Sequence, residues 1–427
     1  MKIKFGVILL CVCSLLEAKQ QVLKIDDLVE IALTHSPDIN IRKLDFQSAQ
    51  ARTKFAEGFY LPRLDAQANG GKQYSSFKEQ DDIDVLVGSL GASQLLYDFG
   101  KTAGKVSAST QESLALEAQM QQTISDKIFL VKQSYYEILK AKGIIDVQVK
   151  NLKLQKQQLY RAQKYLQSGI KTIIDVSDAE VQVEQAKLAL NNARYSLELQ
   201  YAKLEEAIGI VPYEGNYQLY SKKLDMKNMS KHLPRVSTPL KKLEMYAYQH
   251  RYVLGASEYF VSSASSNVGV AQGDYYPTVS LAGNYSQQRV NENAFALTPE
   301  HQGQVTVNMQ WNLFSGYQTD ASVQEAKIGV LKASSQVNSV KLSVKREVLE
   351  SHIALRQSKD SVVLSQSITN ASMKKFEQAQ KRYENELSDY VELQDAQQGY
   401  IEALSDLVNA YYDYFIAMAQ LDHAIGK

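Results

Sequence analysis

Hydrophobic and polar residues alternate along two stretches that occupy matching places in the two halves of the chain. In residues 61–71 every second residue from Leu64 to Ala68 is apolar, and residues 277–286 repeat the pattern. A period of two predicts a strand with one apolar and one polar face. Each stretch is followed by a second expected strand, at 85–97 and at 303–314.

The four expected strands suit either a membrane or a soluble sheet. About ten residues is the length that a tilted membrane strand requires. The polar stretches that join each pair, 72–83 and 287–302, are expected to be exposed loops. A soluble antiparallel sheet with one solvated face shows the same alternation. The pattern alone therefore leaves both alternatives open.

Most of the remaining chain has the pattern of long helices. Residues 101–167 and 317–384 lack proline and are rich in Gln, Lys, Ala, Leu, Ser and Val, which predicts helices on the order of 100 Å long. The segments after them carry apolar residues at spacings of three and four, which fits a coiled-coil seam or an ordinary helical bundle. The seam residues are Ala179, Val183, Ala186, Leu190, Ala193, Leu197 and Leu204, and then Ala396, Tyr400, Ala403, Leu407, Ala410, Tyr414, Ala417, Leu421 and Ala424.

The chain is an internal duplication. Residues 161–209 recur as 378–426 without a gap, so that Gly209 matches Gly426. Such a long register indicates two copies of one folding unit. We expect a first repeat at 19–209 with a helix turn near 168–179, a connector at 210–239, and a second repeat at 240–427 with a turn near 385–396. A helix opens each repeat, with a break before Pro37 in the first and with Leu28 and Ala32 recurring as Leu243 and Ala247.

The first 18 residues are expected to be an export signal. A basic start precedes an apolar core from Phe5 to Leu16, which is the pattern of a secretory signal. The alternative, an uncleaved membrane anchor, needs a longer apolar run. Because Cys11 and Cys13 both lie in the signal, the mature chain is expected to have no cysteine.

Composition argues against several classes of function. Lys and Arg together number 47, and so do Asp and Glu. This balance of charge differs from the excess of basic residues that is typical of a nucleic-acid-binding protein. The six histidines show no metal-ligand spacing, and the chain has neither a phosphate-binding glycine loop nor a Gly-x-Ser-x-Gly motif. We therefore expect no enzyme, no metal site and no cofactor.

The strand count bears on assembly. No stretch after the signal approaches the roughly 20 apolar residues of a membrane helix, so a mature chain that spans a membrane must do so with strands. Four strands cannot close a barrel, and open edges in lipid leave backbone groups unsatisfied. Two copies would give eight strands and a filled interior, whereas three would give twelve and room for a passage. The count favours a pore but does not determine the number of subunits.

Several duplicated motifs point to a known family. They are the Tyr-x-Pro motifs at Tyr60 and Tyr275, the matching segments 94–100 and 310–316, and the helix turn at 168–179 between long helices. In this order they resemble the TolC family of outer-membrane channel proteins over nearly all of the mature chain. The resemblance implies a mainly α-helical protein with membrane β-structure, in which duplicated long coiled-coil hairpins carry four strands per chain into a trimeric 12-stranded barrel.

The resemblance also implies a function and partners. It implies a homotrimer in outer-membrane lipid whose helical tunnel lies in the periplasm and docks on a periplasmic adaptor protein and an inner-membrane pump. Such a channel is a passive conduit for small molecules such as drugs, and the pump supplies the energy. The alternative within this class is a conduit for type I protein secretion. The alternative from a different class is a periplasmic coiled-coil adaptor.

An acidic constriction at the helix turns is a further implication of the resemblance. Glu392 and Asp395 match acidic residues that line the family's tunnel end. Threefold symmetry would bring together three copies of each, and such a ring attracts cations. The alternative is that both are solvated carboxylates near the start of a helix, where the helix dipole favours negative charge.

The family's gate contacts match this chain only in part. Asp175 and Tyr383 match an acidic and an aromatic residue of the gate, but Ser388 stands where the family has a basic residue. We therefore expect the gate to be held either more weakly or by other pairs, and Lys171, one turn before Asp175, is a candidate for the missing base.

Overall fold

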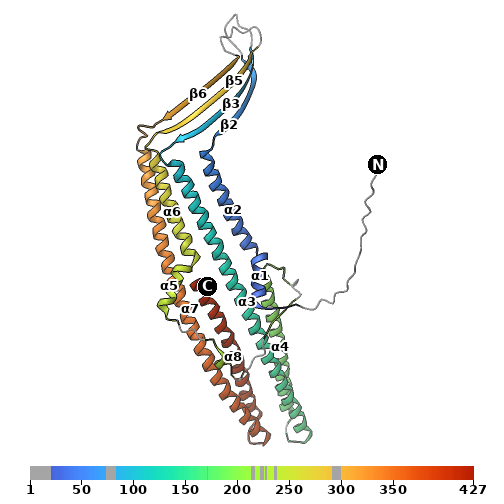
Figure 1. Ribbon diagram of the computed structural model, residues 1–427. Coiled ribbons are helices and arrows are strands. Elements are labelled where there is room, and N and C mark those ends of the chain that lie inside the picture. The colour runs from blue at the N-terminus through green and yellow to red at the C-terminus, as the bar shows by residue number, and fades with distance from the viewer. Residues whose placement is uncertain are drawn as a thin grey trace, which may run out of the picture. The chain divides into compact units, whose positions relative to one another are not determined.

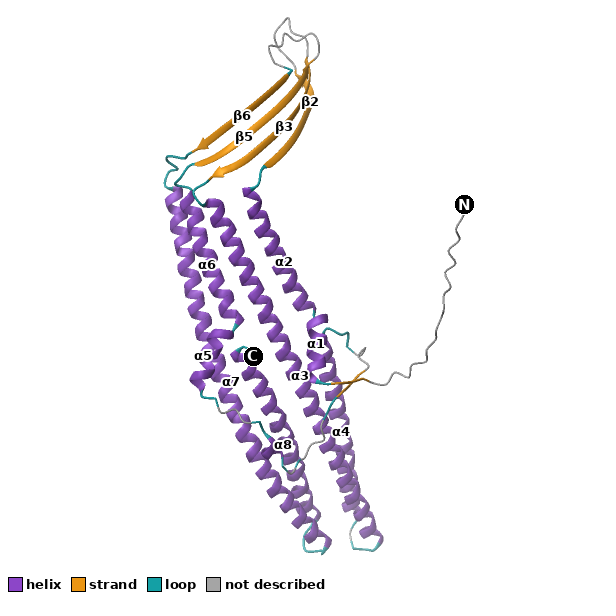
Figure 2. Cartoon of the chain, in the orientation of Figure 1, coloured by secondary structure: helices purple, strands orange, loops and turns teal. Residues whose placement is uncertain are grey.

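The protein is mainly α-helical, with a four-stranded antiparallel sheet (Figure 2). The computed structural model describes residues 21–73, 83–170, 172–212, 217–221, 226, 228–234, 238–290 and 300–427. The expected signal, Lys171 and parts of the loops and of the connector lie outside these residues. No helix in the described ranges is both long and apolar enough to cross a membrane.

The α-helices and β-strands follow one another in the same order in both halves, and only the short 3-10 helices η1 and η2 differ in position. The first half contains β1 (Gln21–Leu23), α1 (Ile25–His35), α2 (Pro37–Glu57), η1 (Gly58–Tyr60), β2 (Arg63–Gln73), β3 (Ile83–Tyr97), α3 (Lys101–Gln167) and α4 (Ile173–Ile208). The second contains β4 (Tyr217–Leu219), η2 (Met229–His232), α5 (Leu240–His250), α6 (Tyr252–Gly273), β5 (Thr278–Val290), β6 (His301–Gln310), α7 (Gln318–Glu384) and α8 (Tyr390–Ile425). The long helices α3 and α7 each have 67 residues, and α4 and α8 each have 36.

The breaks in the opening helices have a local cause in the first half. Ser36 is extended (φ −64°, ψ 120°), because a residue before proline is driven out of the helical region. In the second half Arg251 is extended in the same place (φ −74°, ψ 114°) without a proline. Leu28, Ala32, Leu243 and Ala247 are all buried, so the recurring apolar pairs pack the two opening helices in the same way.

Strand β6 is shorter than the pattern predicts. It ends at Gln310, whereas alternation predicts a strand to 314. The Trp311 indole nitrogen donates a hydrogen bond of 3.0 Å to the Tyr275 carbonyl oxygen. The chain beyond it turns toward α7, with Tyr317 at a φ of 64°. Alternation of side chains alone could not distinguish this turn from continued strand.

The sheet has the order β2-β3-β5-β6 (Figure 1), so β3 and β5 join the two halves. Paired residues share a face: Ala66 lies opposite Leu90, and Leu90 lies opposite Tyr285. The register places most apolar residues on one face and most polar residues on the other, with Val85, Val87 and Leu95 as exceptions on the polar face. The apolar face holds Leu64, Ala66, Ala68, Leu86, Leu90, Leu281, Tyr285, Val305, Val307 and Met309, and the polar face holds Asp65, Gln67, Asn69, Ser89, Asn284, Ser286, Gln304 and Thr306.

Aromatic side chains gather where the strands join the helices. Phe99 stacks on Tyr276 with ring centroids 4.9 Å apart, and Tyr97 meets Phe99 edge-on at 4.7 Å. Tyr97, Tyr276 and Trp311 are all exposed. Exposed aromatic rings at one end of an apolar sheet face are typical of the boundary between lipid and water.

The described chain forms two compact units that cut across the repeats. One consists of residues 1–36, 127–237 and 353–420, and the other of 37–126, 238–352 and 421–427. The long hairpin ends of both halves lie in the first unit, whereas the four-stranded sheet lies in the second. The sequence repeats are therefore copies of one chain segment, and packing combines pieces of both copies into each unit.

The coiled-coil seams are buried in the second half and interrupted in the first. All nine seam residues of α8 are buried, whereas Ala193 and Leu197 of α4 are only half-buried. A groove between α3 and α4 begins at Gln200, one turn after Leu197. The seam is buried again at Leu204, so the interruption is confined to Ala193 and Leu197.

Each descending helix ends on a glycine that packs against the opening helix of the same half. Gly209 and Gly426 are left-handed, with φ of 77° and 83°. A Cβ atom on Gly209 would lie 2.6 Å from the His35 carbonyl oxygen, and one on Gly426 would lie 2.9 Å from that of His250. Only glycine combines this backbone conformation with so close an approach.

Gly209→Ala should destabilise the protein more than Gly169→Ala. Gly169 has a similar φ of 73° but open space around its Cβ position, so its replacement costs only the strain of a left-handed alanine, about 1 kcal/mol. Gly209→Ala adds a clash with backbone, for a total on the order of 3 kcal/mol. Urea unfolding of the two purified variants measures the difference, and equal losses would show that the contact with His35 can relax.

Candidate functional site

The turn between α3 and α4 is built by a capping box. The Asp175 carboxylate accepts hydrogen bonds from the backbone nitrogen of Thr172 (2.9 Å) and from its hydroxyl group (2.8 Å). Such reciprocal bonds satisfy backbone groups that a helix start leaves free. Asp175, a predicted gate residue, is therefore held at the tip of the first hairpin.

The turn between α7 and α8 contains the predicted residue Ser388. Asp389 caps α8 by accepting a 2.8 Å hydrogen bond from the backbone nitrogen of Glu392. The Ser388 hydroxyl oxygen is buried and has no hydrogen-bond partner among the described residues. Ser388 therefore does not replace the family's basic residue by a hydrogen bond of its own.

A cluster of three tyrosines lies where the two hairpins end. Tyr383 of α7 is only 3% exposed, and its ring centroid lies 6.2 Å from that of Tyr165 in α3 and 6.2 Å from that of Tyr390 in α8. Burial raises the pKa of Tyr383, and the negative charge of Asp175 raises it further. Asp175 and Tyr383 are thus close enough to interact, and the tyrosine cluster brings the two hairpins together.

An ion pair that the sequence does not reveal links the hairpins beside this cluster. Arg161 of α3 lies 2.6 Å from Glu384 of α7, measured from guanidinium nitrogen to carboxylate oxygen. Both side chains are about one-third exposed, and pairs of this kind contribute up to about 1 kcal/mol. The basic residue of this pair comes from the first hairpin, whereas the family's basic residue corresponds to Ser388 of the second.

The two candidate constriction residues differ in their surroundings. Glu392 forms an ion pair with Arg382, with 3.3 Å between Oε1 and Nε, whereas Asp395 is exposed. They lie three residues apart on α8, so they share one face of that helix. Arg382 and Glu392 both belong to the second hairpin, so their pair joins α7 to α8 and leaves the contact between hairpins to other residues.

Above the tips, the two hairpins meet through α3 and α8. Lys140 pairs with Asp413 at 3.0 Å, and the Lys150 ammonium group donates a 2.6 Å hydrogen bond to the Tyr400 hydroxyl group. In this part of the molecule the helices follow the order α4, α3, α8 and α7 (Figure 1). The outer faces of the row therefore belong to α4 and α7.

Both outer helices carry exposed apolar residues. On α4 they are spaced by seven, at Ile174, Val181, Leu188 and Tyr195, and all are more than half exposed. On the lower part of α7 the exposed residues are Ile353, Val363, Leu364 and Ile368. A spacing of seven on an exposed helix face is typical of a seam that packs against another helix.

The charges of the four helices alternate along the row. Residues 140–164 of α3 contain seven basic and one acidic side chain, and residues 390–413 of α8 contain five acidic and none that is basic. Residues 173–199 of α4 contain five acidic and two basic side chains, whereas residues 353–384 of α7 contain six basic and three acidic. The two outer helices thus carry opposite net charge.

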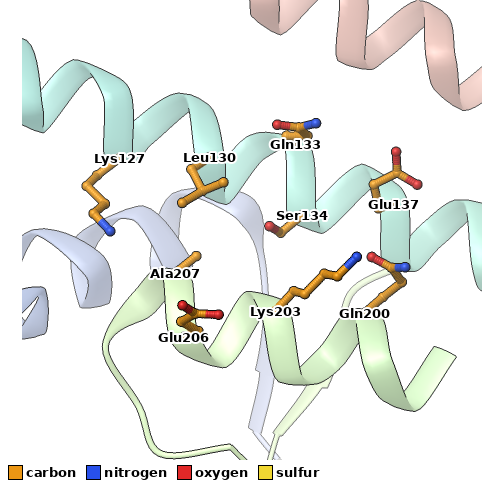
Figure 3. Close-up of a pocket in the computed structure, with 9 residues that line it drawn as sticks. All are labelled: Lys127, Leu130, Gln133, Ser134, Glu137, Gln200, Lys203, Glu206 and Ala207. Carbon is orange, nitrogen blue, oxygen red and sulfur yellow. The ribbon is translucent and has the colours of Figure 1, made fainter. Parts of the chain in front are cut away.

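The groove between α3 and α4 holds mixed charges (Figure 3). Its volume is about 480 Å³, with Lys127 and Glu137 on the α3 side and Lys203 and Glu206 on the α4 side. No group of three or more His, Cys, Asp or Glu side chains in the described part of the chain is arranged to hold a metal ion. The arrangement of charges in the groove suggests no catalytic chemistry.

Fold and site together define a class of protein: a channel-forming chain with a membrane sheet and long helical hairpins that end in a polar and aromatic tip. Residues 28–210 and 246–427 match the model of the outer membrane efflux protein family. The chain belongs to this family, whose members are outer-membrane channels of efflux systems. It is therefore an outer-membrane efflux channel.

Two curated relatives have similar sequences. The chain is 26% identical over 359 residues to the outer membrane protein TolC of Vibrio cholerae, which covers 81% of this chain and 77% of that protein. It is 20% identical over 414 residues to the cation efflux system protein CusC of Escherichia coli, which covers 94% of this chain and 86% of that one.

Solved structures share the fold. A crystal structure of CusC matches with a TM-score of 0.84 at 18% identity, over 94% of this chain and 92% of that one. The CmeC outer membrane channel of Campylobacter jejuni matches with a TM-score of 0.82 at 17% identity, over 94% and 85%. The expected fold class is thereby confirmed.

Tyr390→Phe should make the tip more resistant to alkaline pH. Burial raises the pKa of Tyr390 to about 12, with smaller contributions from Tyr383 and Asp178. A raised pKa means that the neutral phenol contributes stability below the usual value near 10, and that this stability is lost as pH rises toward 12. Its hydroxyl group has no partner among the described residues, so phenylalanine should cost little at neutral pH.

The measurement is the stability of the purified protein between pH 9 and pH 12, followed by circular dichroism. The variant should lose stability at a higher pH than the parent protein. Tyr160→Phe is the matched control, because Tyr160 is exposed on α3 and its replacement should leave the profile unchanged. An unchanged profile in Tyr390→Phe would mean that Tyr390 ionises freely in the folded protein.

Proposed function

We propose that the chain is one subunit of a homotrimeric duct that exports small molecules such as drugs across the outer membrane. An inner-membrane pump drives the export through a periplasmic adaptor protein, and the duct itself is passive and carries no catalytic group. One observation carries the proposal: a four-stranded sheet with an apolar face, a polar face and two open edges, joined to long hairpins.

The open edges support assembly into a closed barrel. β2 and β6 each pair with only one described strand, and unpaired backbone groups in lipid cost several kcal/mol each. Three copies supply twelve strands, with each β6 edge pairing with the β2 edge of the next copy. Twelve strands leave a passage, whereas the eight from two copies would be filled by side chains.

The hairpins support the same ring of copies. An exposed apolar seam and net negative charge on α4 complement an exposed apolar face and net positive charge on α7. If α7 of one copy packs against α4 of the next, both apolar faces are buried and the alternation of charge continues around the ring. Because such a contact joins two different faces of the subunit, every face is paired only when the subunits form a closed ring.

The polar face of the sheet supports a conduit for varied small molecules. Its side chains are mostly amides and hydroxyls, and the charged residues Arg63 and Asp65 lie 3.0 Å apart and pair with each other. A lining of this kind offers hydrogen bonds without a strong preference for either sign of charge. Discrimination by charge then falls to the hairpin tips.

The tips act as the gate in this proposal. The tyrosine cluster and the Arg161–Glu384 pair hold the two hairpins of one copy together. Asp395 and Glu392 of three copies form the acidic ring at the constriction, with Arg382 screening Glu392 in part. The lock thus uses Arg161 of the first hairpin in place of a basic residue at Ser388.

Leu188→Asp should prevent or weaken the trimer. The change places a carboxylate in the apolar seam of α4, and burying an unpaired charge against α7 of the next copy costs several kcal/mol. Native mass in detergent should shift from three chains to one. Val149→Asp is the control, because Val149 is also an exposed apolar residue (47%, against 62% for Leu188) but lies on an inner helix, α3, and its trimer should persist. A stable Leu188→Asp trimer would exclude α4 from the contact.

Neutralising the acidic ring should reduce cation selectivity. Glu392→Gln and Asp395→Asn together remove six carboxylates from one trimer, so the preference for K⁺ over Cl⁻ should fall by at least about twofold. Reversal potentials in planar bilayers under a salt gradient measure it. Glu402→Gln, which removes an exposed carboxylate higher on α8, is the control and should change nothing. Unchanged selectivity in the double variant would remove both residues from the constriction.

A further inference from the structure

Buried polar atoms without partners are concentrated in one short part of the contact between the two hairpins. Gln155 and Gln158 of α3 are each 4% exposed, and Gln397 of α8 is 0% exposed. The side-chain oxygens of all three, and the amide nitrogen of Gln397, have no hydrogen-bond partner among the described residues. The hydroxyl groups of Ser388 and Tyr390, at the lower end of the same segment, are in the same situation.

The glutamines lie at the contact between the hairpins. The Gln155 amide nitrogen donates a bond at the limiting distance of 3.5 Å to Gln394 of α8, which in turn donates a 2.6 Å bond to Gln182 of α4. Because α3 runs toward the tip and α8 runs away from it, Gln158 follows one helical turn below Gln155 and Gln397 one helical turn above Gln394. Amides from both hairpins therefore occupy a short stretch of the contact on either side of the Gln155–Gln394 bond, which we call the glutamine seam (Gln155, Gln158, Gln182, Gln394 and Gln397).

The contact above the glutamine seam has a different character. Lys150 donates to the Tyr400 hydroxyl group at 2.6 Å, and the Tyr400 ring stacks on Phe376 at 5.7 Å. Val147 of α3 and Leu407 of α8 are fully buried. Polar groups there are paired and the apolar groups are packed, so separating the hairpins at this level would lose favourable contacts without a gain in hydration.

Separation has the opposite effect at the glutamine seam. A buried amide without a partner carries a desolvation penalty that is relieved when water reaches it. Exposure of Gln158 and Gln397 would therefore favour the separated hairpins. The Arg161–Glu384 pair and the tyrosine cluster lie directly below and oppose this tendency.

We propose that the glutamine seam is a built-in separable segment: the hairpins part below the Lys150–Tyr400 contact, water enters between the amides, and the tip opens once the lock below is released. The inference rests on the proposed function of the tips as a gate, and it adds the length of hairpin that moves and the force that moves it. Closure is then a balance between a lock at the tip and a seam that is more stable when hydrated.

The test replaces amides of the seam by an apolar side chain of nearly the same shape. Gln397→Met removes a donor and an acceptor without partners while keeping an unbranched side chain, so it should favour the closed seam. Gln366→Met is the matched control. Gln366 of α7 is also buried with an oxygen that has no described partner, but its nitrogen donates to the Met226 carbonyl oxygen, away from the seam.

Opening of the seam is measured with a cysteine introduced as Gln155→Cys in purified trimers, because a thiol at this buried position is alkylated only when the seam opens. Conductance is measured separately in planar bilayers. In the Gln397→Met background the alkylation rate should fall by about tenfold, and the conductance should fall with it. Gln366→Met should leave both unchanged. Gln158→Met, in the same reporter protein, is the second seam variant in case Gln397→Met fails to form trimers.

The outcomes distinguish the two proposals. An alkylation rate that is unchanged in both seam variants, or one that falls equally in Gln366→Met, overturns the glutamine seam as a separable segment. A rate that falls in the seam variants while conductance stays the same supports the separable segment and overturns the tips as the gate.

Discussion

The backbone N–H and C=O groups along the outer edges of β2 and β6 impose the constraint on which the rest of the structure depends. Lipid offers no hydrogen bonds, so a four-stranded membrane sheet cannot persist alone. The register that gathers most apolar side chains of the sheet on one face also leaves a largely polar face, and closure of the edges by other copies turns that face inward. Channel formation and subunit assembly thus follow from the same unsatisfied backbone groups.

The helical hairpins meet a second requirement, which is to be stable along most of their length and separable at one end. Apolar seams of small and large residues hold α3, α4, α7 and α8 together over many turns. Near the tips the contact changes to amides, tyrosine hydroxyl groups and one ion pair, which water can solvate nearly as well as the protein does. A change in the chemistry of one helix contact can therefore set where a long, otherwise rigid hairpin is able to move.

Much of the fold could be read from local patterns. The absence of proline predicts α3 to Gln167 and α7 to Glu384, and both helices end there. The predictions were less accurate where an element ends for a tertiary reason: β6 stops at Gln310 because Trp311 bonds to Tyr275, and the seam of α4 is interrupted beside a groove. At the candidate site, the charge of Asp175 raises the pKa of Tyr383, and their role in a gate stays a prediction; the family's basic position at Ser388 is occupied by a hydroxyl group without a described partner, and Lys171 lies outside the described residues.

The sequence by itself determined the duplication, the lengths of the helices, the two faces of each strand and the family, because each depends on periodicity or on motifs within one stretch of chain. Only the tertiary structure decided that Arg161 meets Glu384, that Tyr165 meets Tyr383, and that the side-chain oxygens of three glutamines are buried without a described partner where two hairpins touch. These residues lie more than 200 positions apart in the sequence. Their meeting depends on the rotation and the axial register of packed helices, which no local pattern records.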